Sequence, residues 1–291
     1  ENHANVTGGI LHTIAVGQIQ HLEVTQCTLQ ANWAGVGGGF GLIFALSNTH
    51  NVTMTNNIVM SGNATNGGVL SIFLNMAIPS PTLLLALNNN LVTNVRVAST
   101  NGLGGFARLF LTNVTTLELN ARDNVFQNVS GGVFSIDHSQ AANQNITLER
   151  NHFDSNTAIR PGAVISSVDS TEIHLSLLDN QLVNHDNNYA LIYLSSQQCF
   201  IHSTYNEYAN NTHTHIHMLT PGGQFVSIND QILDALDNWL LFNSTSDGPT
   251  IHQNVSVSHL SASNPHSFIT MISALNGANQ TLSLLNVSIS D

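Results

Sequence analysis

The feature that most constrains this chain is a short motif that recurs about every 29 residues. The motif is an asparagine, or a small stand-in, followed two positions later by an apolar residue. Its clear copies begin at Asn57, Asn90, Asn124, Asn151, Asn180 and Asn206. Weaker copies begin at Cys27, Asp234, Leu260 and Asn286. Ten copies spaced 26 to 34 residues apart cover the chain, and a fixed period of this size indicates a solenoid whose repeats contact only their neighbours.

Each repeat carries two strand patterns, one on either side of the motif. Before it, β-branched and polar residues alternate, as in residues 146–149 and 255–258, which is typical of a half-buried strand. After it come small or turn-forming pairs such as Gly131-Gly132, which supply the positive φ angles of a tight corner. A second apolar strand follows, as in residues 133–136 and 163–165.

These patterns predict an all-β fold, a single parallel β-helix of about ten coils that spans residues 1–291. A leucine-rich repeat would need its leucine consensus and a helical segment, and a propeller blade needs about 40 residues and four strands. Coils stacked at the interstrand spacing of about 4.8 Å would make a rod roughly 45–50 Å long. Neither end carries an amphipathic capping helix.

The recurrent asparagine has a physical explanation in such a fold. Asparagine tolerates the left-handed corner conformation, and its amide can bond to the same residue one coil above and below. We therefore predict an internal ladder made by the six clear motif asparagines. The alternative is that they are ordinary turn residues in an asparagine-rich chain.

The composition excludes several classes of partner. Charged residues make up 8% of the chain, there is no lysine, and the net charge is −12, so no basic patch is available for nucleic acid. No apolar run approaches the roughly 20 residues that span a bilayer. The chain begins at Glu1 without a signal-peptide pattern, which is expected of a mature, processed or excised protein.

Asparagine also occurs in eleven Asn-X-Ser/Thr sequons, which are potential N-glycosylation sites. They are Asn5, Asn51, Asn63, Asn113, Asn128, Asn145, Asn210, Asn243, Asn254, Asn279 and Asn286. Several share a register with the motif: Asn51, Asn145 and Asn254 each stand six residues before a copy. Rows of glycans would hydrate a surface that has few charges. We expect a glycosylated protein that is extracellular or on the cell surface, with N-linked glycans and no other cofactor; a bacterial origin would remove the glycans.

The two cysteines are not expected to form a disulfide. Cys27 and Cys199 lie about six coils apart, which is near 28 Å along a stacked rod and beyond disulfide reach. Cys27 occupies a motif position, where a free thiol packs as a small hydrophobe.

A histidine cluster is the first candidate for chemistry. His213, His215 and His217 alternate, so on a strand all three would point to one side, and paired histidines with a third ligand can hold zinc or copper. The alternative is an exposed polar face with Thr214 and Ile216 pointing inward. No carboxylate partner stands beside the cluster, so we assign no metal site.

An acidic cluster is the second candidate. Asp230, Asp234 and Asp237 could supply the paired carboxylates that glycoside hydrolysis requires, or they could form a solvated edge. We assign no catalytic residue. Five aromatic residues could stack on sugar rings but are too sparse to define a binding strip: Trp33, Tyr189, Tyr193, Tyr205 and Tyr208.

The Gly-Gly-Val/Phe-apolar strand starts and the Asn-X-Phe-X-X-Asn turn from Asn151 to Asn156 resemble repeats of the pectin-lyase-like superfamily. Within that superfamily, these repeats look like those of polymorphic outer-membrane-type and protist surface β-helix proteins. The resemblance covers nearly the whole chain and implies a right-handed parallel β-helix; it says little about function. Enzymes of that superfamily show an Asp-Asp pair, a Gly-His-Gly and an Arg-Ile-Lys, or an arginine base beside calcium-binding acids. The chain has none of the first three motifs, and Arg150 and Arg160 lack an acidic constellation.

The ends of the repeat suggest a partner. The pattern starts within the first dozen residues and continues to residues 286–289, and an open coil offers unpaired backbone groups that recruit another strand. Two open ends would join head to tail into a filament; alternatively, the chain is a fragment of a longer solenoid. We expect a non-enzymatic structural or surface protein. The alternatives are a polysaccharide lyase or hydrolase or a sugar-binding module with a groove on one face, and an adhesion protein.

Overall fold

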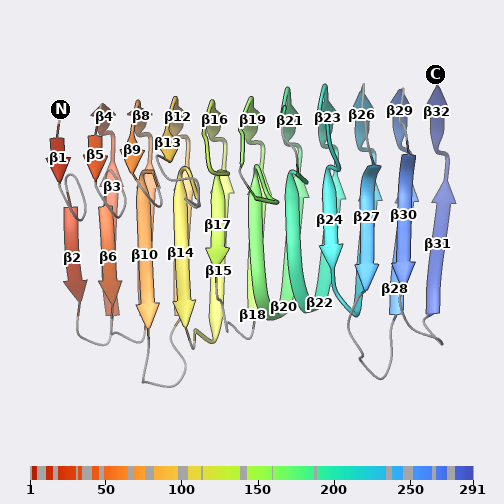
Figure 1. The fold of residues 1–291 in the computed structure, drawn as a ribbon, viewed down its shortest axis with the longest axis horizontal. Helices are drawn as coiled ribbons and strands as arrows, with labels where there is room; N and C mark the ends of the chain where they lie inside the picture. Colours follow the sequence, from red (N-terminus) through yellow and green to blue (C-terminus); the bar gives the residue numbers. More distant parts are fainter. Residues whose placement is uncertain are drawn as a thin grey trace.

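The computed structural model describes residues 2–4, 11–15, 19–30, 32–34, 41–45, 49–64, 68–75, 82–97, 104–112, 114–137, 143–158, 160–186, 189–233, 238–244, 252–263, 267–273 and 279–290. These residues form a parallel β-solenoid and contain no helix. Successive coils stand side by side along the long axis, with the two ends of the chain at opposite ends of the stack (Figure 1). The predicted all-β fold class is therefore confirmed.

One sheet consists of ten short strands, eight of which begin directly after a motif position. Its strands are β4 (Thr28–Gln30), β8 (Ile58–Met60), β12 (Leu91–Thr93), β16 (Val125–Gln127), β19 (His152–Asp154), β21 (Gln181–Val183), β23 (Glu207–Ala209), β26 (Gln231–Leu233), β29 (Ser261–Ser263) and β32 (Ser288–Ser290). We call it the short-strand sheet. A further sheet of four strands contains β1 (Asn2–Ala4), β5 (Asn32–Ala34), β9 (Asn63–Ala64) and β13 (Arg96–Val97).

The remaining 18 strands form two parallel rows that join into one sheet. The row before the motif contains β3 (Ile19–Thr25), β7 (Thr49–Thr55), β11 (Thr82–Asn88), β15 (Thr116–Arg122), β18 (Asn143–Glu149), β25 (Gly222–Ile228), β28 (His252–Ser258) and β31 (Asn279–Leu285). The other row contains β2 (Leu11–Ala15), β6 (Gly41–Ala45), β10 (Leu70–Asn75), β14 (Ala107–Thr112), β17 (Phe134–Asp137), β24 (Ile216–Leu219), β27 (Asn238–Ser244) and β30 (Ser267–Ser273). Two long strands bend through the corner and belong to both rows: β20 (Ile165–Leu178) and β22 (Ile192–Thr204).

The structure gives about seven turns, slightly fewer than the ten coils predicted, although the short-strand sheet contains ten strands. The outer turns lie only partly within the described residues. Neighbouring coils pair in parallel and in register, with one shift between Ser167 and Ser170 where β20 pairs with β22; Asn51, for example, pairs with Leu84 and Leu84 with Glu118. Residues at one offset from the ladder therefore form a row in the strands directly before and after it, whereas loops of different length shift the offset in the row that follows the motif.

The six motif asparagines form a buried ladder at the corner before the short-strand sheet. In each step, the amide nitrogen Nδ2 and the backbone N–H of one asparagine donate to Oδ1 of the next, as in the 2.9 Å bonds from Asn90 to Asn124. Nδ2 also donates to a backbone carbonyl, such as that of Met54. All six side chains are 2% exposed or less. The ladder satisfies buried polar groups and fixes the register between coils.

The left-handed backbone conformation occurs one residue before the ladder, not at the ladder asparagine as the sequence led us to expect. Positive φ values near 55° are found at Asn56, Asn89, Asp123, Arg150 and Asp179. Asparagine and aspartate visit this region at low cost. The ladder asparagine is thereby free to adopt an ordinary conformation and to point its side chain inward.

Two of the weaker motif copies are displaced from the positions we predicted. Asn206 donates to Oδ1 of Asp230 from both N and Nδ2, at 2.7 and 3.1 Å, so Asp230 and not Asp234 occupies the next ladder position. In the last coil, Ala262 pairs with Ile289. The residue that follows Leu260 in the ladder row is therefore Val287, and not Asn286. Cys27 and Leu260 do stand at ladder positions, and the Cys27 N–H donates to Asn57 Oδ1 at 3.0 Å.

Aromatic side chains fill the centre of the solenoid. Phe106, Phe126 and Phe134 meet edge to face with ring centroids 5.2 to 5.9 Å apart, and Phe126 stacks on Phe153 at 5.3 Å. All four are fully buried. Contacts of this kind add to the stability that area burial provides. The core is therefore a column of large side chains that crosses the boundaries between coils.

Small residues line the corner before the row of strands that contains β10, β14 and β17, as predicted. Gly104, Gly131, Gly132 and Gly162 have positive φ values between 66° and 104°. At Gly132 an added Cβ would stand 2.5 Å from the carbonyl oxygen of Gly162 in the next coil. Only glycine permits coils to approach this closely here.

Both cysteines are free, as predicted; Cys199 is buried and Cys27 is partly buried. Burial raises the pKa of the Cys199 thiol, which keeps it protonated. Among the described residues there is no helix with the length and apolar character needed to cross a membrane.

Candidate functional site

A groove runs across the outer face of four neighbouring strands, β18, β20, β22 and β25. It encloses about 520 Å³, which is within the range of small-molecule and cofactor sites. Because side chains alternate along a strand, its outer surface comes from every second residue. Its lining residues are Asn145, Ile146, Thr147, His174, Leu175, Ser176, Phe200, Ile201, His202, Gln224 and Val226.

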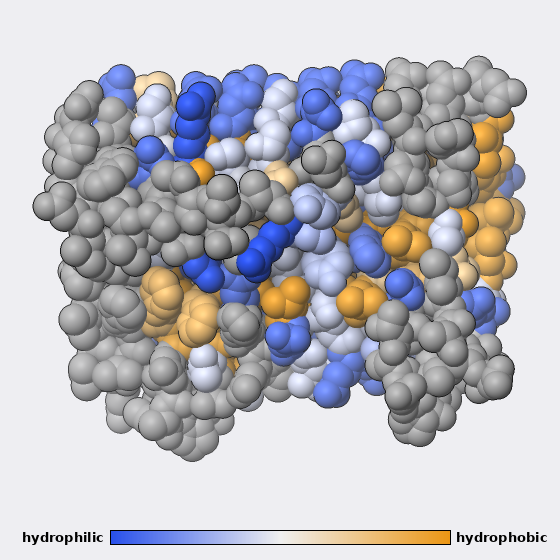
Figure 2. Space-filling model, in the orientation of Figure 1, coloured by the Kyte–Doolittle hydropathy of each residue, from blue (hydrophilic) through white to orange (hydrophobic). Residues whose placement is uncertain are grey.

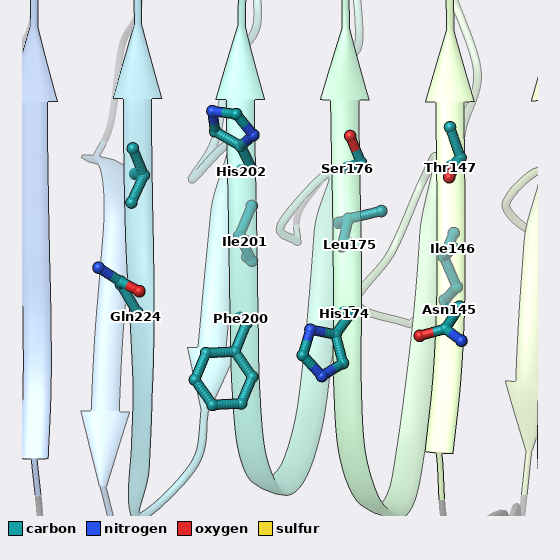
Figure 3. Close-up of a pocket in the computed structure, with 11 residues that line it drawn as sticks. Asn145, Ile146, Thr147, His174, Leu175, Ser176, Phe200, Ile201, His202 and Gln224 are labelled. Atoms are coloured by element: carbon teal, nitrogen blue, oxygen red, sulfur yellow. The ribbon is translucent and has the colours of Figure 1, made fainter.

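One row of side chains dominates this groove and is labelled in Figure 3. In register, the row contains Asn145, His174, Phe200 and Gln224. The imidazole of His174 stacks on the ring of Phe200, with centroids 4.8 Å apart and an interplanar angle of 14°. Because the two planes are nearly parallel, the rings form a short aromatic shelf on an otherwise polar sheet.

Polar groups surround this shelf. His174 Nε2 lies within hydrogen-bonding distance of the Glu172 carboxylate, which orients the imidazole. His202 Nε2 pairs with Thr204 Oγ1 at 3.2 Å. An aromatic face flanked by imidazole, amide and hydroxyl groups suits a ligand with an apolar face and hydroxyl edges, such as a sugar ring.

A second, smaller hollow of about 350 Å³ lies at the turn after the short-strand sheet. It is lined by Asn94, Arg96, Asn128, Ser130, Ser155 and Thr157. Asn128 Nδ2 donates to Asn94 Oδ1 in the neighbouring coil at 3.3 Å. The sequon asparagine at this position is therefore hydrogen-bonded to another exposed amide. This hollow has no aromatic lining and offers weaker recognition than the groove.

The sequon asparagines that the structure describes stand on the outside. Those at positions 128, 145, 210, 254 and 286 are exposed, and those at positions 51, 63 and 243 are half-buried. Asn51, Asn145 and Asn254 occupy one row, as the spacing predicted, because register relates each to its neighbours coil by coil. Asn5 and Asn113 lie outside the described residues, as does the side chain of Asn279.

The three histidines at 213–217 do not share a face. His215 is fully buried and stacks on Tyr208 at 5.4 Å, whereas His217 points outward from β24 and meets Tyr193 edge to face at 5.2 Å. Strand β24 begins only at Ile216, so the alternation we assumed does not extend back to His213. The described residues contain no group of three or more His, Cys, Asp or Glu side chains placed to hold a metal ion.

The acidic cluster is likewise not assembled in a groove. Asp234 and Asp237 lie outside the described residues, and Asp230 is fully buried at the end of the asparagine ladder. Ser227 Oγ donates to Asp230 Oδ2 at 2.6 Å. Burial raises the pKa of Asp230 above its usual value, and the hydrogen bonds from Ser203, Ser227 and Asn206 oppose that shift.

A second buried row at the other corner of the short-strand sheet was not foreseen from the sequence. The N–H of Val129 donates to Asn156 Oδ1 at 2.9 Å, that of Asn156 to His185 Nδ1 at 3.1 Å, and that of His185 to Asn211 Oδ1 at 3.0 Å. All of these residues are fully buried. Burial lowers the pKa of His185 to about 4. The sequence held one sign of this row: each of its four residues stands five positions after a ladder asparagine.

The five aromatic residues named from the sequence do not form a strip. Tyr208 is fully buried, Tyr193 is half-buried, and Tyr189 and Tyr205 are exposed; the side chain of Trp33 lies outside the described residues. The aromatic residue in the groove is Phe200, which the sequence did not single out.

Arginine pairs with acids in neighbouring coils. Arg108 Nε lies 2.8 Å from Asp137, and Arg150 Nε lies 2.7 Å from Asp123. The hydrogen bond from Arg150 lowers the pKa of Asp123. Both pairs tie neighbouring coils together. The Arg150–Asp123 pair is exposed and contributes little because solvent screens it, whereas the side chains of the Arg108–Asp137 pair are largely buried.

Comparison of the chain with protein-family models, curated proteins and solved structures gave no match.

Proposed function

We propose that this chain is a non-enzymatic, glycosylated, extracellular β-solenoid with a structural or surface role. One observation carries the proposal: asparagine falls into two classes, one inside and one outside. The six ladder asparagines are 2% exposed or less, and none of them begins a sequon. The sequon asparagines whose burial is described lie on the surface or partly exposed, where a bulky glycan is tolerated.

The charge pattern supports the same role. Only 8% of the residues are charged, so few ionised side chains are available to hydrate the surface. N-linked glycans along the sides would supply hydration and keep neighbouring rods apart. Asn51, Asn145 and Asn254 would align three of them on one face.

Site-specific mass spectrometry tests this proposal. The chain is secreted from a eukaryotic host and treated with peptide-N-glycosidase in ¹⁸O water, which converts each glycosylated asparagine to labelled aspartate. We expect label at Asn128, Asn145, Asn210 and Asn254. Exposed Asn94 and Asn184, which do not begin sequons, are internal controls and should carry none. Secretion without label at any sequon would overturn the proposal.

We further propose that the solenoid associates with a second copy head to tail. In the last described coil, Leu282 and Leu284 are 49% and 50% exposed, whereas their partners in the preceding coil, Val255 and Val257, are 1% exposed. Apolar colour gathers at that end in Figure 2, over β31 and β32. A further coil stacked there would bury these leucines and pair the open strand edge.

Electron microscopy of the protein tests the association. Fibres whose axial repeat matches one solenoid, or a multiple of it, are expected. The variant Leu282→Asp/Leu284→Asp places charges on the stacking face and should give single rods of unchanged length. Single rods from the unmodified protein at high concentration would contradict head-to-tail association.

The alternative function is a sugar-binding or carbohydrate-active module, and the groove on β18, β20, β22 and β25 favours it. Its described lining holds aromatic, amide and imidazole groups but no carboxylate pair, so it suits binding better than hydrolysis by paired acids. Unglycosylated protein would be assayed on polygalacturonate and alginate. Turnover of either polymer would favour an enzyme and contradict the non-enzymatic proposal.

The finer family assignment is also a proposal. We propose that the solenoid is a pectin-lyase-like, right-handed β-helix; the parallel coils and the inward asparagine ladder support it. An experimental structure with left-handed coils would reject it.

A further inference from the structure

The groove contains one of the sequons. Asn145 and Thr147, the first and third residues of Asn145-Ile146-Thr147, both line it, and both point outward from β18, with Asn145 exposed and Ile146 buried between them. Any sugar attached to Asn145 Nδ2 therefore starts inside the groove.

The neighbours of Asn145 match what such a sugar needs. Asn145 pairs in register with His174, and His174 with Phe200. Adjacent strands are about 4.8 Å apart, so the His174–Phe200 shelf begins one strand from Asn145 and ends two strands from it. Figure 3 shows these three side chains in sequence along the row. His202, Ser176 and Gln224 lie around the shelf and can bond to hydroxyl and acetamido groups.

We propose that the occupant of this groove is the proximal part of the chain's own N-linked glycan at Asn145. The first N-acetylglucosamine lays the apolar face of its ring on His174, and the second reaches Phe200. The inference rests on the proposed glycosylation and extends it, since it assigns a role to the groove and a fixed position to one glycan. Stacking on a flat aromatic face desolvates both surfaces, as it does for other ring ligands.

The attachment itself is ordinary N-glycosylation by the secretory machinery of the cell. The bond between sugar C1 and the pyrophosphate oxygen of a polyisoprenyl donor breaks, and a bond from Asn145 Nδ2 to C1 forms. The amide loses one proton and the polyisoprenyl pyrophosphate departs with the electron pair. The groove residues take no part in this transfer; they bind its product.

A matched control exists in the same row. Asn254 is exposed and pairs in register with Gln224 on one side and Thr281 on the other, so no aromatic residue is its direct neighbour. A glycan at Asn254 would project into solvent from an equivalent strand position. The two sites differ in their neighbours and not in their place on the sheet.

The test measures glycan release from the folded, secreted protein by peptide-N-glycosidase under native conditions, site by site. We expect release from Asn145 to be about tenfold slower than from Asn254, because the enzyme must first lift the sugar off the shelf. In Phe200→Thr, and separately in His174→Thr, release from Asn145 should rise toward that from Asn254. Threonine keeps the strand preference, and an unchanged rate at Asn254 with an unchanged melting temperature shows that the fold persists.

The outcomes are distinct. Equal rates at the two sites in the unmodified protein, or a slow rate at Asn145 that neither variant changes, would overturn the groove assignment. Occupancy at Asn254 but none at Asn145 would overturn it while the proposed function stands. No occupancy at any sequon would overturn the proposed function itself.

Discussion

The two corners of the short-strand sheet carry buried rows that differ in how many hydrogen bonds join each coil to the next. At the corner before the sheet, each asparagine uses both its backbone N–H and its Nδ2 to reach Oδ1 of the next, as between Asn124 and Asn151. At the corner after the sheet, one backbone N–H makes the step, as from Val129 to Oδ1 of Asn156. Apolar residues, Val95 and Val129, occupy the earlier positions of this second row.

This difference shows what repetition of one residue type achieves. An amide bonds to a copy of itself in both directions, so a run of asparagines satisfies every group and fixes the register. A mixed row satisfies fewer groups and tolerates a titratable side chain such as His185. We therefore expect the first corner to contribute more to stability and the second to contribute more to the loss of stability in acid.

The largest expected effect comes from Asn124→Leu in the first row. The change leaves the N–H and one amide hydrogen of Asn90 and the carbonyl of Leu87 without their partner. At roughly 1–3 kcal/mol for each buried unsatisfied group, we expect a loss of about 3 kcal/mol or more in the free energy of unfolding. Urea denaturation measures it. The matched change Asn156→Leu affects fewer bonds and should cost less; an equal or greater cost would contradict the comparison.

Acid should weaken the fold through His185. Its pKa is about 4 in the folded protein because burial disfavours the charged ring, with smaller opposing effects from the backbone of Asn156 and from Asp154. The unfolded chain, with a pKa near 6.5, takes up a proton first as pH falls. Stability is therefore complete above about pH 6.5 and declines toward pH 4, by about 3 kcal/mol at most.

The variant His185→Asn tests this directly, since it restores an amide between Asn156 and Asn211. Stability measured by chemical denaturation across pH 4 to 7 should vary less in the variant than in the unmodified protein. Identical pH profiles would assign the acid sensitivity to other groups.

A smaller effect is expected at Asp230, where acid should raise the stability of the fold instead of lowering it. Its pKa is raised in the folded state, so the charged form is disfavoured at neutral pH and stability rises as pH falls through the folded pKa. Asp230→Asn extends the first ladder by one amide and removes the buried charge. We expect about 1 kcal/mol of added stability at pH 7 and none at a pH low enough to protonate Asp230. A loss of stability at pH 7 would mean that the carboxylate itself is required.

The smallest effect is expected for an asparagine on the outside. Asn254→Gln removes a sequon at an exposed position, and in unglycosylated protein it should change the free energy of unfolding by less than about 0.5 kcal/mol. Thermal denaturation beside Asn124→Leu would then separate the two classes of asparagine. A large loss would show that exposure alone does not distinguish them.

Much of the fold followed from the motif because one asparagine per coil marks both the period and the corner. The left-handed residue was misplaced by one position because asparagine is favoured both for that conformation and for the ladder, and Asn56 stands directly before Asn57. Asp230 was missed because the repeat shortens to 24 residues after Asn206 and because an acceptor-only side chain replaces an amide. The periodicity of a sequence does not reveal such a substitution.

The groove could have been found from the sequence by applying the motif offset to every coil. Asn145, His174 and Phe200 each stand six residues before a ladder asparagine, so their common row was implicit in the spacing. What the sequence could not supply is the stacking of His174 on Phe200, which depends on side-chain rotation, or the burial of His215 just before β24 begins.

The asparagine ladder also gives the solenoid an electrical direction. In each step Oδ1 faces the preceding coil and Nδ2 donates to the next, so the six amide dipoles add like those along a helix. The positive end of this column meets the Asp230 carboxylate, and the two hydrogen bonds from Asn206 offset part of the cost of burying that charge. Two solenoids stacked in the same sense would align their columns, whereas reversed stacking would set like poles against each other.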